Sequence, residues 1–168
     1  MKPGEEESIK EAAAVNDEKK AANPVKHSEW VERLKERGIN VDTALGYMMQ
    51  DEQLYREMLE TFIGDTGSRK EEISRFYAEK NLKDYQIRVH ALKSASRNVG
   101  ADVLAELAFE QEMAAEKMEV SVVEEGFSPM MAEYDRIITL LTEIIGTPAG
   151  EKDSTEESPD EIMEFYPD

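Results

Sequence analysis

The stretch DYQIRVHALKSASRNV, residues 84–99, decides the fold class of this chain of 168 residues. Steps of three and four residues place one set of its side chains on a single side of an α-helix. Asp84 is the expected N-cap of this helix, and Gly100 is its expected stop. The set that we expect to be buried consists of Tyr85, Val89, Leu92, Ser96 and Val99.

The rest of the chain between residues 28 and 146 also has helical periodicity, with no strand alternation. The step from Phe62 to Ile73 keeps helical phase and favours one long helix, although Gly64 and Gly67 leave a break between them open. Pro129 is typical of a first helical turn, so we expect a kink or a restart there. The further helices are expected over residues 28–37, 42–50, 51–77, 101–118 and 127–145.

Four of these helices are long and amphipathic, and short links join them. The helical periodicity predicts an all-α fold. The short links imply that helices next to each other in the chain are antiparallel. We expect an antiparallel up-and-down four-helix bundle with one or two short N-terminal helices. The expected organisation is a flexible segment or linker over 1–27, the bundle over 28–146, and an acidic, mostly disordered tail over 147–168.

The net charge of -18 restricts the partners of the chain. Residues 147–168 alone hold eight acidic residues and one basic residue. A body this acidic is not expected to bind nucleic acid or an anionic membrane surface. The chain has no cysteine, no apolar run long enough to span a bilayer and no apolar signal region at its start. We therefore expect a cytoplasmic protein, or the cytoplasmic end of a larger membrane sensor.

His90 is predicted to lie on the solvent side of the helix over 84–99, opposite the buried set. Gln86, Lys93, Ser94 and Arg97 fall on the same outer side. A neutral imidazole can attack phosphorus, and neighbouring cations stabilise the transferred charge. A lone exposed histidine beside lysine and arginine is common, so spacing alone also leaves open a solvated face without a function.

The string HALKSASRNVGA, residues 90–101, resembles the signature of histidine-containing phosphotransfer (HPt) domains. That pattern is His-x-Leu-Lys-Gly, a small or hydroxyl stretch, Gly-Ala, and a leucine-rich helix that ends in Leu-Glu. Here Leu104 follows Gly-Ala, and Phe109-Glu110 stands in the place of Leu-Glu. The resemblance covers roughly residues 30–146.

The resemblance implies roles for individual residues. His90 would be the phosphoacceptor, and Lys93 would pair with the phosphoryl oxygens. Gly100 would allow the tight turn into the next helix. Ser94 replaces the usual glycine after the lysine, which puts in doubt any role that needs bare backbone. Gln86, Ser94 and Arg97 are the expected partner contacts, of which Gln86 and Arg97 come from the helical wheel and not from the family pattern.

The implied function is phosphorelay signal transduction in a two-component system of bacterial type. His90 would take a phosphoryl group from a receiver-domain aspartate and pass it to another receiver. The expected partners are receiver domains of response regulators or of a hybrid sensor kinase. No cofactor or metal is expected on this chain, since Mg²⁺ would belong to the receiver. The sequence has no motif for an ATP site, so the chain would be a phosphocarrier and not an enzyme. It is expected to be a monomer.

Three alternatives have the same fold. A di-iron or di-manganese bundle needs inward Glu-x-x-His pairs, and Ile87 stands three residues before His90, so we reject it. A receiver-directed phosphatase would use an amide such as Gln86 or Asn98 to orient water. A non-phosphorylated adaptor of the same fold is the third alternative, and it would normally lack the histidine.

Overall fold

The computed structural model describes residues 27–146, and within them the regular structure is entirely helical. The prediction of an all-α fold is confirmed. The segments predicted to be flexible or acidic tails, apart from His27, lie outside the described residues. The helices of the described part are α2 (Glu29–Glu36), α3 (Val41–Tyr47), α4 (Glu52–Gly64), α5 (Thr66–Ala78), α6 (Leu82–Val99), α7 (Asp102–Glu116) and α8 (Val120–Ile145).

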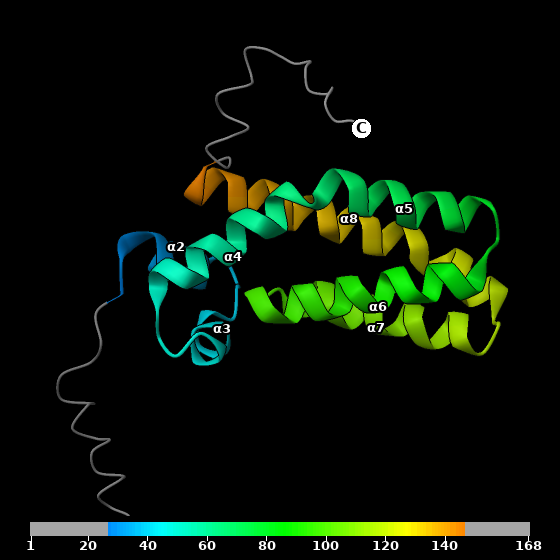
Figure 1. The fold of residues 1–168 in the computed structure, drawn as a ribbon, viewed down its shortest axis with the longest axis horizontal. Helices are drawn as coiled ribbons and strands as arrows, with labels where there is room; N and C mark the ends of the chain where they lie inside the picture. The colour runs from blue at the N-terminus through cyan, green and yellow to red at the C-terminus, as the bar shows by residue number, and fades with distance from the viewer. Residues whose placement is uncertain (1–26, 147–168) are drawn as a thin grey trace, which may run out of the picture.

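Helices α6, α7 and α8 lie beside α4 and α5, and the chain reverses direction at the turns between α5, α6, α7 and α8 (Figure 1). Helices α4 and α5 follow one another along one side, and α6, α7 and α8 complete the bundle. The short helices α2 and α3 lie at the end where α8 finishes. The most extensive packing is between α6 and α7, which places the helix of His90 firmly against its successor in the chain.

Three tyrosines are the largest fully buried side chains, and two of them have a hydrogen-bond partner for the hydroxyl group. The Tyr55 hydroxyl donates to the carbonyl of Val99 at 2.8 Å. The Tyr85 hydroxyl donates to the side-chain carbonyl of Gln111 in α7. The third is Tyr134 of α8. Buried polar groups need such partners, so these bonds help to define how α6 sits on α4 and α7.

Gly100 ends α6 and ties it to the start of α3. Its φ is 88°, and a Cβ there would lie 2.7 Å from the carbonyl oxygen of Asn40. The Asn40 amide donates to the Gly100 carbonyl at 2.9 Å. A residue with a side chain would be both strained and in collision with backbone, so this close approach requires glycine.

The segment over 51–77 forms two helices instead of the single helix that its periodicity favoured. The break falls at Asp65, between Gly64 and the new helix. The Thr66 hydroxyl donates to the carbonyl of Phe62 at 3.2 Å, a back-bond that bends helices. Gly64 and Gly67, on the two sides of the break, lower the helix propensity of this segment. The apolar residues keep their helical spacing across the break, but the helix itself is interrupted.

Three expected helix boundaries were also wrong. Asn81, not Asp84, caps α6, since its side-chain oxygen accepts from the Asp84 amide at 3.2 Å. Helix α7 ends at Glu116, and Met118, predicted as part of its apolar stripe, is exposed in the following turn. Similarly, α3 runs from Val41 to Tyr47 instead of over 42–50, and Asn40 caps it.

Pro129 lies inside α8 and not in a first turn, which contradicts the predicted restart. The helix already begins at Val120. A proline frees the carbonyl four residues earlier, which here belongs to Glu125. Both residues are exposed, so water can satisfy that carbonyl and the helix continues.

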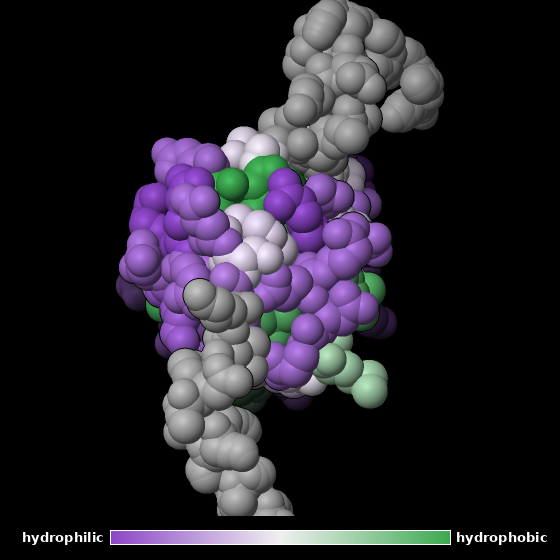
Figure 2. All heavy atoms as spheres, turned by 90° about the vertical axis from the view of Figure 1, so that its left-hand side faces the viewer, coloured by the Kyte–Doolittle hydropathy of each residue, from purple (hydrophilic) through white to green (hydrophobic). Residues whose placement is uncertain are grey.

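The surface at the α2–α3 end is largely hydrophilic, with hydrophobic side chains in small separate areas (Figure 2). Across residues 27–146, no helix has the length and apolar character that crossing a membrane requires. The apolar faces of the helices are buried against each other, which is what their amphipathic pattern predicts.

Candidate functional site

His90 stands on the outer side of α6, as its spacing predicts. The five positions of the expected buried set, Tyr85, Val89, Leu92, Ser96 and Val99, are all buried. The His90 side chain keeps 56% of its surface exposed. The site is therefore presented by a rigid helix whose opposite face is anchored in the core, not by a loop.

Glu112 of α7, which the sequence analysis did not identify, holds the imidazole. Its Oε2 lies 2.7 Å from His90 Nδ1. An ionised carboxylate can only accept a hydrogen bond, so Nδ1 must carry the proton. In a neutral ring the lone pair is then on Nε2. Nε2 has no hydrogen-bond partner among residues 27–146, so its lone pair is not engaged by the described part of the chain.

Lys93 does not stand free beside His90, as the outer-side position suggested, but pairs with the same carboxylate. Its Nζ lies 2.8 Å from Glu112 Oε1, and its side chain is only 12% exposed. The ammonium group also lies 5.2 Å from the centroid of the Phe109 ring, within cation–π range. Glu112 thus joins the histidine and the lysine into one cluster.

The Glu112 carboxylate is held in its ionised form. Its side chain is 14% exposed. Burial raises its pKa, but the hydrogen bonds from Lys93 and His90 and their charges outweigh burial, so the pKa lies below the ordinary value of 4.5. The cluster therefore keeps a negative charge beside Nδ1 at neutral pH, and that charge can stabilise a cationic imidazole ring.

The remaining predicted site residues are divided between different surfaces. Gln86 lines a hollow together with His90 and Glu112, to which Lys83 and Ile87 also contribute. Ser94 is exposed on the same helix.

Arg97 borders a separate polar hollow with Asn40, Tyr47 and Asp102. The structure thus brings Gln86 to His90 and leaves Arg97 away from it.

The acidic residue that contacts His90 is Glu112, and not Glu110 of the Leu-Glu position in the family pattern. Glu110, placed at the Leu-Glu position in the sequence, is exposed. Gln111 is buried against Tyr85, and Glu112 at the edge of the buried stripe reaches His90. The sequence signal that could have identified Glu112 is the helical spacing that places Gln111 in the buried stripe. Glu112 is its neighbour and therefore lies at the boundary between core and solvent.

The ligands for a di-metal site are not assembled here. No group of three or more His, Cys, Asp or Glu side chains in the described part of the chain is close enough to hold a metal ion. The acids of this region stand apart or pair with cations, as Glu112 does with Lys93.

Comparison with known proteins identifies the class. A family model described as "Hpt domain" matches residues 57–145, more than half of the chain. No curated protein and no solved structure matches. This chain therefore belongs to the Hpt domain family, whose members are histidine phosphotransfer modules in phosphorelay signalling and carry the phosphoryl group instead of acting as enzymes. The match takes in all of α6, α7 and α8, and so includes the whole His90 cluster.

Proposed function

We propose that His90 is the phosphoacceptor of this Hpt domain and that it exchanges the phosphoryl group with receiver aspartates. The observation that carries the proposal is a half-exposed imidazole ring whose Nδ1 is held by Glu112 at 2.7 Å, which leaves Nε2 without a hydrogen bond within residues 27–146. One nitrogen is fixed and the other is open, which is the arrangement that an in-line nucleophile needs.

The transfer step balances without a co-reactant on this chain. The Nε2 lone pair attacks the phosphorus of a receiver phospho-aspartate, the bond from phosphorus to the aspartate oxygen breaks, and the aspartate leaves as a carboxylate. The imidazole then carries a proton on Nδ1 and phosphorus on Nε2, so it is cationic. The Glu112 carboxylate stabilises that charge through its hydrogen bond.

Lys93 is suited to contact the phosphoryl oxygens. An ammonium group has three donors, and the bond to Glu112 at 2.8 Å occupies one of them. The remaining donors can reach oxygens on a group attached to His90, which stands one helical turn away. The Mg²⁺ that assists such transfers would be held by the receiver, in keeping with a carrier that supplies only the histidine and its positioning contacts.

The surface around His90 is suited to a receiver domain. Ile87 and Phe109 are both exposed and lie on the two helices that contribute the cluster. Apolar side chains of this kind form the centre of protein interfaces, and charged ones form the rim. Lys83 and Gln86 supply polar contacts at the same hollow. The partner we propose is therefore a receiver that buries Ile87 and presents its phospho-aspartate to Nε2.

A transfer experiment tests the assignment. The protein is mixed with a receiver radiolabelled on its aspartate, and label on the chain is followed for acid lability and base stability. We expect label on the wild type and none on His90→Gln. Equal label on both proteins would overturn the assignment of His90.

The same experiment separates the alternatives. Loss of label from the receiver to solution, with none on His90, would identify a receiver-directed phosphatase, for which Gln86 is the amide beside His90. Binding of the receiver without loss or transfer of label would identify an adaptor.

A further inference from the structure

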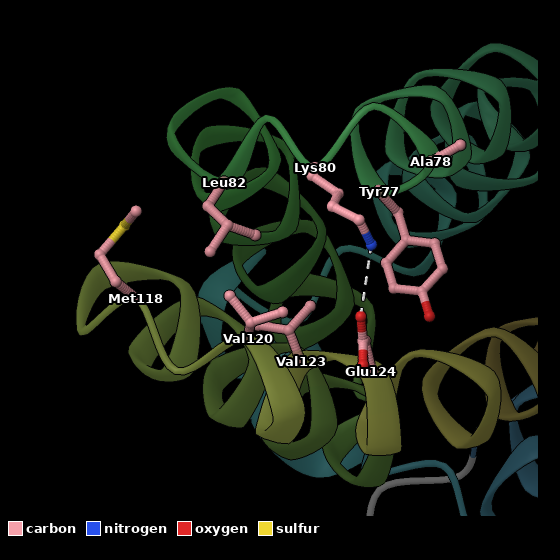
Figure 3. A pocket seen from close by; sticks show the side chains of 8 residues that line it. All are labelled: Tyr77, Ala78, Lys80, Leu82, Met118, Val120, Val123 and Glu124. Atoms are coloured by element: carbon pink, nitrogen blue, oxygen red, sulfur yellow. Dashed lines mark hydrogen bonds and ion pairs between the residues drawn. The ribbon is translucent and has the colours of Figure 1, made fainter.

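A hollow at the end of the bundle opposite α2 and α3 lies outside the His90 cluster. It is formed where the α5–α6 turn meets the α7–α8 turn (Figure 3). Its volume is about 190 Å³, and it opens to solvent on one side. The residues that line it are Tyr77, Ala78, Lys80, Leu82, Met118, Val120, Val123 and Glu124.

The floor of this hollow is apolar and its rim carries charge. Leu82, Val120 and Val123 converge on it from α6 and α8, as Figure 3 shows. Met118 and Val120 are both exposed large hydrophobic residues, so apolar surface stays in water when the hollow is empty. On the rim, Lys80 Nζ lies 3.4 Å from Glu124, and both side chains are well exposed, so this pair contributes little to stability.

We propose that residues 162–166 of the same chain, with the sequence IMEFY, occupy this hollow. These residues lie outside the described part of the structure. Ile162, Met163, Phe165 and Tyr166 are the large apolar side chains of an otherwise acidic and small-residue stretch over 147–168. Docking removes these apolar side chains from water, which is favourable, and the hollow offers apolar surface for them to contact.

The distance along the chain permits this contact. Val120 lines the hollow, and the 26 residues of α8 carry the chain about 39 Å from it at 1.5 Å per residue. The 15 residues from 147 to 161 span up to about 50 Å when extended at 3.3 Å each. The chain can therefore run back along α8 and place Ile162 at the hollow without unwinding the helix.

Charge does not add a net attraction between the hollow and the segment. Lys80 on the rim, with Lys83 and Lys117 in the flanking residues, can approach Glu161 and Glu164 of the segment. Lys80 already pairs with Glu124, and Glu116 and Glu119 stand in the same turns. The apolar floor therefore supplies the attraction.

A spin-label experiment on the full chain tests the proposal. The protein has no cysteine, so Asp168→Cys creates a single attachment site two residues beyond Tyr166. The expected result is selective broadening of the methyl resonances of Leu82, Val120 and Val123. Uniform or absent broadening would overturn the docking.

Mixing separates the possible occupants. Isotope-labelled protein without the spin label is mixed with spin-labelled protein that carries no isotope. No broadening is expected in this mixture, because the contact is within one chain. Broadening in the mixture would mean that a second copy fills the hollow, and the proposal would be wrong.

A matched pair of variants controls for general effects of added charge. Val120 and Val122 are 44% and 43% exposed, but only Val120 lines the hollow. Val120→Glu should remove the selective broadening, and Val122→Glu should keep it. Equal loss in both variants would show that the tail responds to the charge of the surface and not to this hollow.

Discussion

On the inner side of α6, Tyr85 is fully buried and its hydroxyl donates to Gln111, whereas on the outer side His90 is half-exposed and contacts Glu112. The two acceptors are neighbours on α7, yet one lies in the core and the other lies at the boundary between core and solvent. The contrast shows that the α6–α7 pair both stabilises the fold and forms the site. Its inner contacts hold α6 in place so that the outer contacts can hold the imidazole.

The largest expected contrast is between His90→Gln and Leu92→Ala. His90→Gln should abolish labelling by a receiver and change the free energy of unfolding by less than about 0.5 kcal/mol, because the site is at the surface. Leu92 is fully buried, so its truncation should cost about 2–5 kcal/mol. Urea unfolding and transfer assays on both variants measure the contrast. Strong destabilisation by His90→Gln would mean that the outer side of α6 also holds the fold.

Gly100→Ala should have the next largest effect, because it acts where α6 ends and α3 begins. We expect a loss of about 2–4 kcal/mol from backbone strain together with the collision against Asn40. Gly38 is the matched control, with φ 96° but open space around it, so Gly38→Ala should cost only about 1 kcal/mol. Equal losses in urea unfolding would show that the close approach to Asn40 does not matter.

Glu112→Gln should slow phosphoryl transfer about tenfold, by analogy with the loss seen when the carboxylate partner of a metal-bound histidine is removed. Glu110→Gln, on the exposed neighbour, should leave the rate unchanged. A structural role for Glu112 alone would lower stability without changing the rate in the folded protein. Initial rates at saturating receiver separate the two.

The pH dependence of stability gives a second measurement on Glu112. Its pKa is lower in the folded protein, so its contribution is complete above the ordinary value of 4.5 and is lost as the pH falls through the folded pKa. Wild type should therefore lose more stability than Glu112→Gln as the pH falls below about 4.5. Parallel curves for the two proteins in urea titrations would contradict the pKa shift.

The smallest effect is expected for Ser94→Gly, which restores the residue usual in the family pattern. Ser94 is exposed inside α6, so glycine should cost about 0.5 kcal/mol through helix propensity. Transfer should change by less than about twofold, because a serine already leaves room for a partner beside the ring. A large gain in rate would show that the hydroxyl hinders the receiver, and comparison of initial rates would detect it.

Much of this arrangement follows from local periodicity. The spacing of Tyr85, Val89 and Leu92 correctly predicted the inner side of α6 and the exposure of His90. Periodicity was less informative about interruptions. Asp65 breaks a segment whose phase is continuous, and Pro129 is tolerated inside α8 because the carbonyl it frees faces water.

The sequence by itself determined that residues 28–146 are helical and that His90 points outward, because side-chain direction on a helix follows from spacing alone. The tertiary structure decided which groups meet that histidine. Glu112 reaches Nδ1 only because α7 packs on α6 in one particular register, and the same register takes Lys93 away from solvent. Contacts between helices depend on how two surfaces fit together, and no spacing within either helix specifies that fit.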